Sequence, residues 1–62
     1  MNWELYEVWA SNEDGTEDLI DTTKSLKEAK QIATINLTED MTHCTIYKEN
    51  EDGELVEVEI IK

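Results

Sequence analysis

Hydrophobic residues follow two different periods along this chain. In residues 25–37 they recur at intervals of three and four. At 100° per residue they fall within an arc of about 140°, wide enough for one core-facing stripe, made of Leu26, Ala29, Ile32, Ala33 and Leu37. Ser25 and Glu28 have the S-x-x-E spacing that satisfies the free N–H groups of a helix start. The pattern predicts one amphipathic helix over residues 25–37.

On both sides of this helix the period falls to two, which is typical of strands with one buried face. The alternating segments are residues 3–10 and 16–22 before the helix, and residues 43–49 and 54–61 after it. Each pair is joined by an Asn-Glu-Asp-Gly tetrad, and the tetrad recurs after 38 residues. We therefore expect a hairpin over residues 2–23 and another over residues 43–61. Between Thr38 and Thr42 we expect a loop or a frayed last helical turn.

These elements predict an α+β domain of the order ββαββ. Its two β-hairpins form a four-stranded, mainly antiparallel sheet, with the one helix packed on one face. The 62 residues make a single domain over 1–62, close to the smallest size at which a core sustains itself. The pattern leaves the strand order open, although the charged second strand is the expected edge.

The loop length decides which side chains share a face of the sheet. A two-residue Asp-Gly loop would pair apolar with charged residues, Val8 with Asp21 and Ile46 with Glu59. A three-residue Glu-Asp-Gly loop suits a type I turn followed by a left-handed glycine, and it pairs Val8 with Ile20, Ile46 with Val58 and Cys44 with Ile60. Because a one-residue slip exchanges the faces, we expect burial to enforce the three-residue loop.

This register predicts two very different faces. The side facing the helix would carry Tyr6, Val8, Ala10, Ile20, Cys44, Ile46, Val56, Val58 and Ile60. The helix-free face would carry Trp3, Leu5, Glu7, Trp9, Leu19, Thr45, Tyr47, Leu55, Glu57, Glu59 and Ile61. Inverting the first strand would bury both tryptophans, but it would also bury Glu7 without a partner. A twist or bulge that turns one tryptophan inward is the alternative.

Charge narrows the classes of partner. Sixteen carboxylates face five lysines and no arginine, for a net charge of −11. Such a surface repels phosphate backbones and anionic lipids, so we expect no direct nucleic-acid binding and no membrane binding. A basic protein surface is the favoured partner, although solubility alone would also explain the acidity. Because Lys24, Lys27 and Lys30 lie in or near the helix, the negative charge concentrates on the hairpins.

The sequence offers no constellation suited to catalysis. His43 and Cys44 are neighbours on a strand and point to opposite faces. One histidine and one cysteine form neither a zinc site nor a nucleophilic triad. Residues 48–59 fit an EF-hand loop at five of six positions, but Lys48 stands where the first oxygen ligand is needed. We expect no catalytic residue, no metal, no cofactor and no enzymatic activity.

The compartment follows from similar observations. A single cysteine suits a reducing environment. The N-terminus has no basic segment followed by an apolar run, and no apolar run is long enough to span a bilayer. We expect a cytoplasmic protein.

Together these features favour a non-enzymatic, acidic protein-binding module. It would be an inhibitor or adaptor, consistent with a phage or mobile-element origin, and it would bind through Trp3, Leu5, Glu7, Trp9, Leu19, Tyr47, Glu57 and Glu59. One alternative is a nucleic-acid mimic, in which Glu57 and Glu59 form a row of charge that occupies the basic groove of a nucleic-acid-binding protein. The other is a homodimer that covers the aromatic face with a second copy and has no assignable activity.

Overall fold

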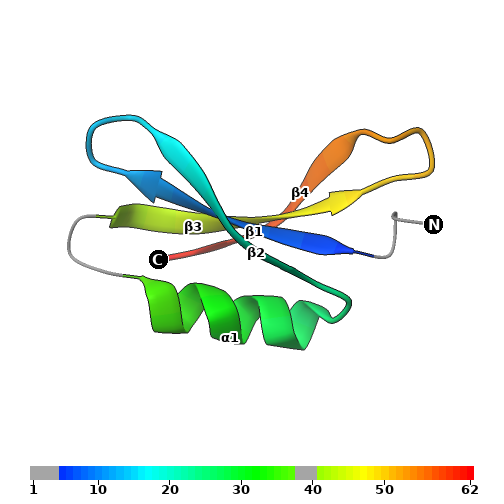
Figure 1. Cartoon of the computed structure of the whole chain (residues 1–62), viewed down its shortest axis with the longest axis horizontal. Coiled ribbons are helices and arrows are strands. Elements are labelled where there is room, and N and C mark those ends of the chain that lie inside the picture. The colour runs from blue at the N-terminus through cyan, green and yellow to red at the C-terminus, as the bar shows by residue number, and fades with distance from the viewer. Residues whose placement is uncertain (1–4, 38–40) are drawn as a thin grey trace.

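A four-stranded antiparallel sheet with one helix across one of its faces makes up the computed structural model, which describes residues 5–37 and 41–62 (Figure 1). Strands β1 (Tyr6–Asn12) and β2 (Glu17–Thr23) form the first hairpin, and helix α1 (Leu26–Asn36) follows. Strands β3 (Met41–Glu49) and β4 (Leu55–Ile61) form the second hairpin. The strand order is β2-β1-β3-β4. The predicted ββαββ fold is confirmed, and the charged second strand is one of the two edges.

The element bounds differ little from those predicted. The start of the first predicted strand and residues 38–40 of the predicted connection lie outside the described residues, and Met41 already belongs to β3. Within the described residues, no helix has the length and apolar character needed to cross a membrane.

Both hairpin turns have the predicted three-residue loop. In the first, the N–H of Asn12 donates to the Thr16 carbonyl at 2.9 Å and that of Gly15 donates to the Asn12 carbonyl at 3.0 Å. The second turn repeats these bonds between Asn50 and Glu54 and between Gly53 and Asn50. Gly15 and Gly53 have φ angles of +89° and +82°. Only glycine enters this region without a steric penalty, which explains why both glycines of the chain stand here.

Further from each turn, a β-bulge shifts the register. Near the turns, Trp9 pairs with Leu19 and Tyr47 with Glu57, as the three-residue loop requires. Beyond the bulges, Val8 lies opposite Asp21 and Ile46 lies opposite Glu59. The extra residues are Ile20 and Val58, which occupy equivalent places in the two hairpins. The prediction of an uninterrupted register is therefore wrong, because a bulge adds one residue to a strand and increases its local twist.

The second bulge exchanges the faces at the end of β4. Ile61 pairs with Cys44 and packs against the core, whereas Ile60 pairs with Thr45 on the helix-free face and is 41 % exposed. Glu59 lies on the helix side, opposite the buried Ile46. The predicted placements of Glu59, Ile60 and Ile61 are therefore wrong, because the extra residue inverts the alternation of all three.

Val56 and Val58 lie on the predicted side of the sheet without being buried there. Val56 pairs with Lys48, and Lys48 pairs with Tyr6, which packs against the core. The side chains of these three paired residues therefore face the helix side of the sheet. Both valines are nevertheless exposed. The 11 residues of α1 span only about 16 Å, too little to cover the second hairpin along its full length.

Helix α1 begins with the predicted Ser25 cap, but the Glu28 side chain does not bond the Ser25 N–H directly, as it would in a capping box. The N–H of Glu28 donates to Ser25 Oγ at 3.4 Å. The Glu28 carboxylate, however, accepts a 2.6 Å hydrogen bond from the Thr23 hydroxyl. The Thr23 hydroxyl oxygen in turn accepts a hydrogen bond from the N–H of Ser25 at 3.5 Å. Thr23 therefore relays the contact that a capping box makes directly.

The core lies where α1 crosses the two central strands. Its buried apolar residues are Val8, Ala10, Cys44 and Ile46 from the sheet and Ala29 and Ala33 from the helix. Leu26, Ile32 and Leu37 pack against its margin, so the predicted helix stripe is confirmed. The two alanines let the helix backbone approach the sheet closely, and Cys44 Sγ lies 3.7 Å from the Ala33 carbonyl oxygen.

The bulge in β4 predicts unequal effects of two neighbouring truncations. Ile61→Ala removes a side chain packed on the core and should lower the free energy of unfolding by about 1–2 kcal/mol. Ile60→Ala removes the same methyl groups from an exposed position and should lower it by less. Urea denaturation measures both. A larger loss for Ile60→Ala would restore the uninterrupted register.

The turn geometry predicts that glycine replacement destabilises through the backbone alone. A Cβ at Gly15 would meet nothing within 4 Å, and one at Gly53 would meet only Glu49 Oε1 at 3.7 Å. Gly53→Ala should therefore cost about 1 kcal/mol from the positive φ, and Gly53→Val more. Gly53→Asn is the matched control, because asparagine tolerates this region better. An unchanged urea midpoint in Gly53→Val would contradict the turn assignment.

Candidate functional site

The helix-free face of the sheet has two aromatic side chains at its centre. Trp9 on β1 pairs with Thr45 and with Leu19, and Tyr47 on β3 pairs with Glu7 and with Glu57. Trp9 and Tyr47 are therefore diagonal neighbours on adjacent strands. The indole N–H of Trp9 donates to Glu7 Oε1 at 2.9 Å, which fixes the ring against its own strand. The predicted outward orientation of Trp9 is confirmed.

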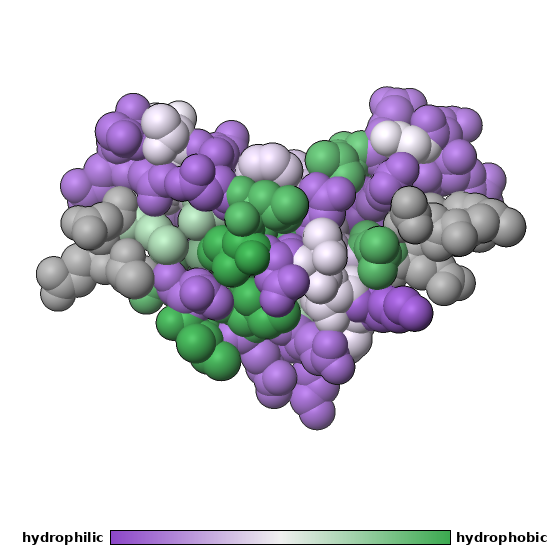
Figure 2. Space-filling model, in the orientation of Figure 1, coloured by the Kyte–Doolittle hydropathy of each residue, from purple (hydrophilic) through white to green (hydrophobic). Residues whose placement is uncertain are grey.

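A shallow groove of about 300 Å³ runs over these rings. It is lined by Trp9, Tyr47, Glu17 and Leu55. Glu17 begins β2 and Leu55 begins β4, so each hairpin supplies one wall. The two hairpins diverge on the side away from α1 (Figure 1), and the space-filling view shows the hollow between them (Figure 2). The groove therefore has an aromatic floor between two arms.

Carboxylates dominate both arms. The first hairpin exposes Glu13, Asp14, Glu17 and Asp18, and the second exposes Glu51, Asp52, Glu54 and Glu57. Within the described residues, the one ion pair joins Lys30 to Glu59, on the other side of the sheet. Hydrogen bonds from the Thr16 hydroxyl and N–H lower the pKa of Asp14 below its usual value, which favours its ionised form. The groove therefore lies in a negative field, and none of its lining residues is a lysine.

The structure brings most of the predicted binding residues together. Glu7, Trp9, Leu19, Tyr47 and Glu57 share the helix-free face. Leu5 precedes β1 and is half-buried, and Trp3 lies outside the described residues.

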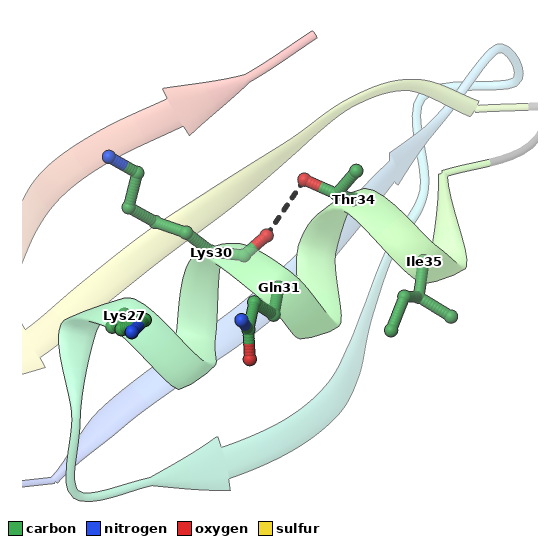
Figure 3. Close-up of a pocket in the computed structure, with 5 residues that line it drawn as sticks. All are labelled: Lys27, Lys30, Gln31, Thr34 and Ile35. Carbon is green, nitrogen blue, oxygen red and sulfur yellow. Dashed lines mark hydrogen bonds between the residues drawn. The ribbon is translucent and has the colours of Figure 1, made fainter.

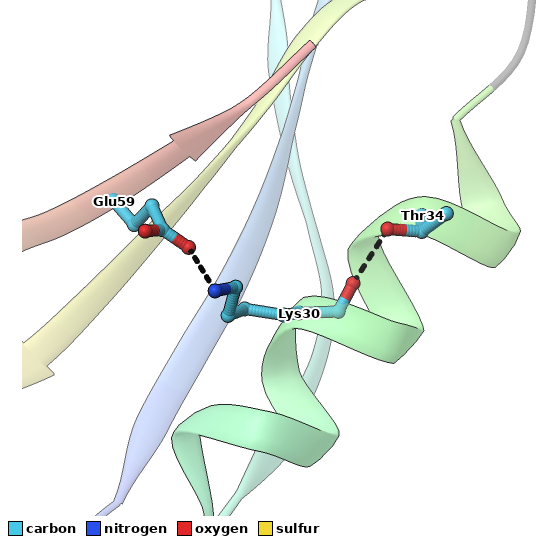
Figure 4. A network of polar contacts seen from close by, with 3 residues as sticks. All are labelled: Lys30, Thr34 and Glu59. Atoms are coloured by element: carbon cyan, nitrogen blue, oxygen red, sulfur yellow. Dashed lines mark hydrogen bonds and ion pairs between the residues drawn. The ribbon is translucent and has the colours of Figure 1, made fainter.

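Glu59 is the exception, and its predicted place on this face is wrong. Its carboxylate points to α1, where Oε2 lies 3.2 Å from Lys30 Nζ (Figure 4). The Lys30 carbonyl accepts a 2.8 Å hydrogen bond from Thr34 Oγ1 in the same network. With the two side chains 49 % and 39 % exposed, the ion pair contributes about 0–1 kcal/mol. Glu57 and Glu59 therefore do not form one row of charge.

Sequence reasoning missed Glu17 as a lining residue and Leu55 as a binding residue. The sequence predicts Leu55 on the helix-free face, but it does not indicate that Leu55 and Glu17 line one groove. The shared groove depends on the adjacency of β1 and β3, which the sequence pattern leaves open. The available signal is the alternation of side chains along a strand, which puts Glu17 on the same face as Leu19, two residues away.

A larger depression lies on the surface of α1, but it is less suited to binding a ligand because one helix supplies all of its lining residues. It encloses about 680 Å³ and is lined by Lys27, Lys30, Gln31, Thr34 and Ile35. All five residues come from one helix, and their side chains diverge (Figure 3). Among the described residues no second element forms an opposing wall, and one of the lining side chains, Ile35, is 79 % exposed, so this depression is open to solvent.

The residues considered for chemistry remain apart. Cys44 is buried, which raises the pKa of its thiol and favours the neutral form. The His43 ring instead contacts Thr42 Oγ1 at 2.9 Å. Among the described residues, no group of three or more histidine, cysteine, aspartate or glutamate side chains is placed to hold a metal ion.

Comparison with known proteins yields no relative from which a role could be transferred. No family model, no curated protein and no solved structure matches the chain. The chemistry of the groove and its arms is therefore the basis for inferring function.

The excess of carboxylates over lysines predicts that salt stabilises this protein. Raising the ionic strength from about 0.01 M to about 0.15 M shortens the Debye length from about 30 Å to about 8 Å. Screening then relieves the self-repulsion of a chain with net charge −11, and Tm should rise. Thermal denaturation followed by circular dichroism measures this. Sodium and tetramethylammonium chlorides should act alike; a flat Tm, or an effect of sodium alone, would contradict general screening.

Proposed function

We propose that this protein is a non-enzymatic protein-binding module that uses the helix-free face of its sheet. The observation that carries this proposal is the pair Trp9 and Tyr47, side by side on the floor of a groove with one wall from each hairpin. Aromatic anchors surrounded by polar residues are typical of the energetic centres of protein interfaces. An inhibitor or adaptor of phage or mobile-element origin, acting in the reducing cytoplasm that suits the thiol of Cys44, fits these features.

The proposed partner is a basic protein surface. Exposed carboxylates on both arms would accelerate its approach and disfavour acidic competitors. Nucleic acids and anionic membranes would be repelled by the same field. Binding would then combine charge on the arms with aromatic contact in the groove.

Two alternatives receive less support. A nucleic-acid mimic needs carboxylates in a regular row, and the ion pair with Lys30 removes Glu59 from the row with Glu57. A homodimer across the helix-free face would cover the exposed Leu19, Leu55 and Ile60, but it would also bring four acidic hairpins together. Like-charge juxtaposition of this kind opposes association.

The test is capture of a partner from a lysate of the source cells by matched variants. Trp9→Ala should abolish capture while circular dichroism reports an intact fold, because this side chain lies outside the core. Ile35→Ala is the control, since it removes an exposed apolar side chain from the opposite surface. A partner retained by Trp9→Ala would overturn the proposal, whether or not Ile35→Ala retains it.

The same variants separate the alternatives. For a mimic, Glu54→Gln and Glu57→Gln together should weaken capture steeply, while Trp9→Ala has little effect. For a homodimer, sedimentation should show a dimer that Trp9→Ala converts to monomer and destabilises at high dilution. Either result would replace the proposed module.

A further inference from the structure

We propose that the groove receives one arginine side chain of the partner, with its guanidinium stacked on Trp9 and its N–H groups directed at Glu17. This inference rests on the proposed binding function and specifies the chemistry that the groove recognises. Four features of the described residues support it: the availability of the Trp9 ring, the placement of the lysines, the composition of the walls and the size of the groove.

The one polar group of the Trp9 ring is already satisfied, which leaves stacking as the interaction that the ring can offer a ligand. Its N–H, which lies in the ring plane, is already used by Glu7 Oε1 at 2.9 Å. This hydrogen bond engages the edge of the indole and satisfies its one polar group, and Trp9 is among the residues that line the groove. The Glu7 carboxylate also places a negative charge beside the ring, which strengthens the attraction of a cation to its π face.

The protein makes a cation–π contact of its own on the other side of its sheet. There, Lys48 Nζ lies 5.3 Å from the centroid of the Tyr6 ring, within the range of a cation–π contact. Among the described residues this is the one such contact, and no lysine lines the groove over Trp9 and Tyr47. Because the chain has no arginine, a second copy of this protein cannot supply the guanidinium. The occupant we infer therefore comes from a different protein.

The walls favour arginine over lysine. A guanidinium is planar and weakly hydrated, so it can stack on an indole while its in-plane N–H groups bond a carboxylate. Glu17 offers that carboxylate from β2, diagonal to Trp9, and Leu55 offers an apolar wall for the methylene stem. A lysine ammonium is compact and strongly hydrated and cannot stack in the same way.

The volume of the groove agrees with a single side chain. About 300 Å³ lies at the lower limit of small-molecule pockets. The groove is also open along the hollow between the two hairpins, so a side chain can enter while its backbone stays above the arms (Figure 2). The exposed carboxylate of Glu57, which pairs with Tyr47 on the same face, would then contact a neighbouring basic residue of the partner.

The experiment titrates the protein with three pentapeptides that differ at one position. The probes are acetyl-Gly-Ser-Arg-Ser-Gly-amide, its lysine form and its citrulline form, which keeps the shape of arginine without the charge. The indole N–H resonance of Trp9, assigned with Trp9→Phe, reports binding at fixed ionic strength. We expect a saturable shift with the arginine peptide, binding about two- to fivefold weaker with lysine, and no shift with citrulline.

Matched substitutions test the assigned wall. Glu17→Gln should weaken arginine binding about two- to fivefold. Glu13→Gln removes the same charge from an exposed turn residue that does not line the groove, and it should leave the affinity within about twofold. Both residues are exposed, so neither variant endangers the fold.

Each outcome decides one of the two proposals. Equal binding of the arginine and lysine peptides, or equal losses in Glu17→Gln and Glu13→Gln, would show diffuse charge attraction and overturn the arginine site. The binding module would still stand if partner capture depended on Trp9. Conversely, capture that ignores Trp9→Ala would overturn the module even if the peptides bound as expected.

Discussion

The contact of Ala29 and Ala33 with the central strand pair is the packing on which this domain depends. These two small residues bring α1 onto Val8, Cys44 and Ile46, and the buried core extends little further. A helix of 11 residues cannot cover two hairpins along their full length. The hairpins therefore project beyond it as acidic arms, and the face away from the helix stays open (Figure 1). The candidate binding surface therefore exists because no further element covers this face within the described residues.

The β-bulges of the two hairpins allow the register set by the turns to differ from the register found next to the core. Near each turn the register is the one that a left-handed glycine imposes, and beyond Ile20 and Val58 it shifts by one residue. The shift brings Ile61 to the core and turns Glu59 toward Lys30. On the turn side of the bulges, Trp9 and Tyr47 stay on the open face with Glu17 and Leu55. The second bulge therefore leaves Glu57 on the open face and places Glu59 on the helix side.

Stability and recognition make opposite demands on the charge of this protein. Carboxylates without ion-pair partners repel one another and weaken a small compact state. The same groups attract a basic partner and would be neutralised when it binds. The aromatic floor adds short-range contacts that salt screens less than it screens the arms. An acidic module of this kind would gain stability from its partner, because binding to the folded state alone shifts the folding equilibrium.

Local chemistry determined most of what the sequence alone predicted. The stripe of α1, the Ser25 cap, both turns and the outward Trp9 depend on neighbours within a few residues, and all are confirmed. The two bulges depend on tertiary structure. The extra residue at Val58 is favoured because it turns the side chain of Ile61 toward the core beneath the helix. Tertiary structure also decided that Glu17 and Leu55 share a groove, since they belong to different hairpins that become neighbours only because β1 pairs with β3.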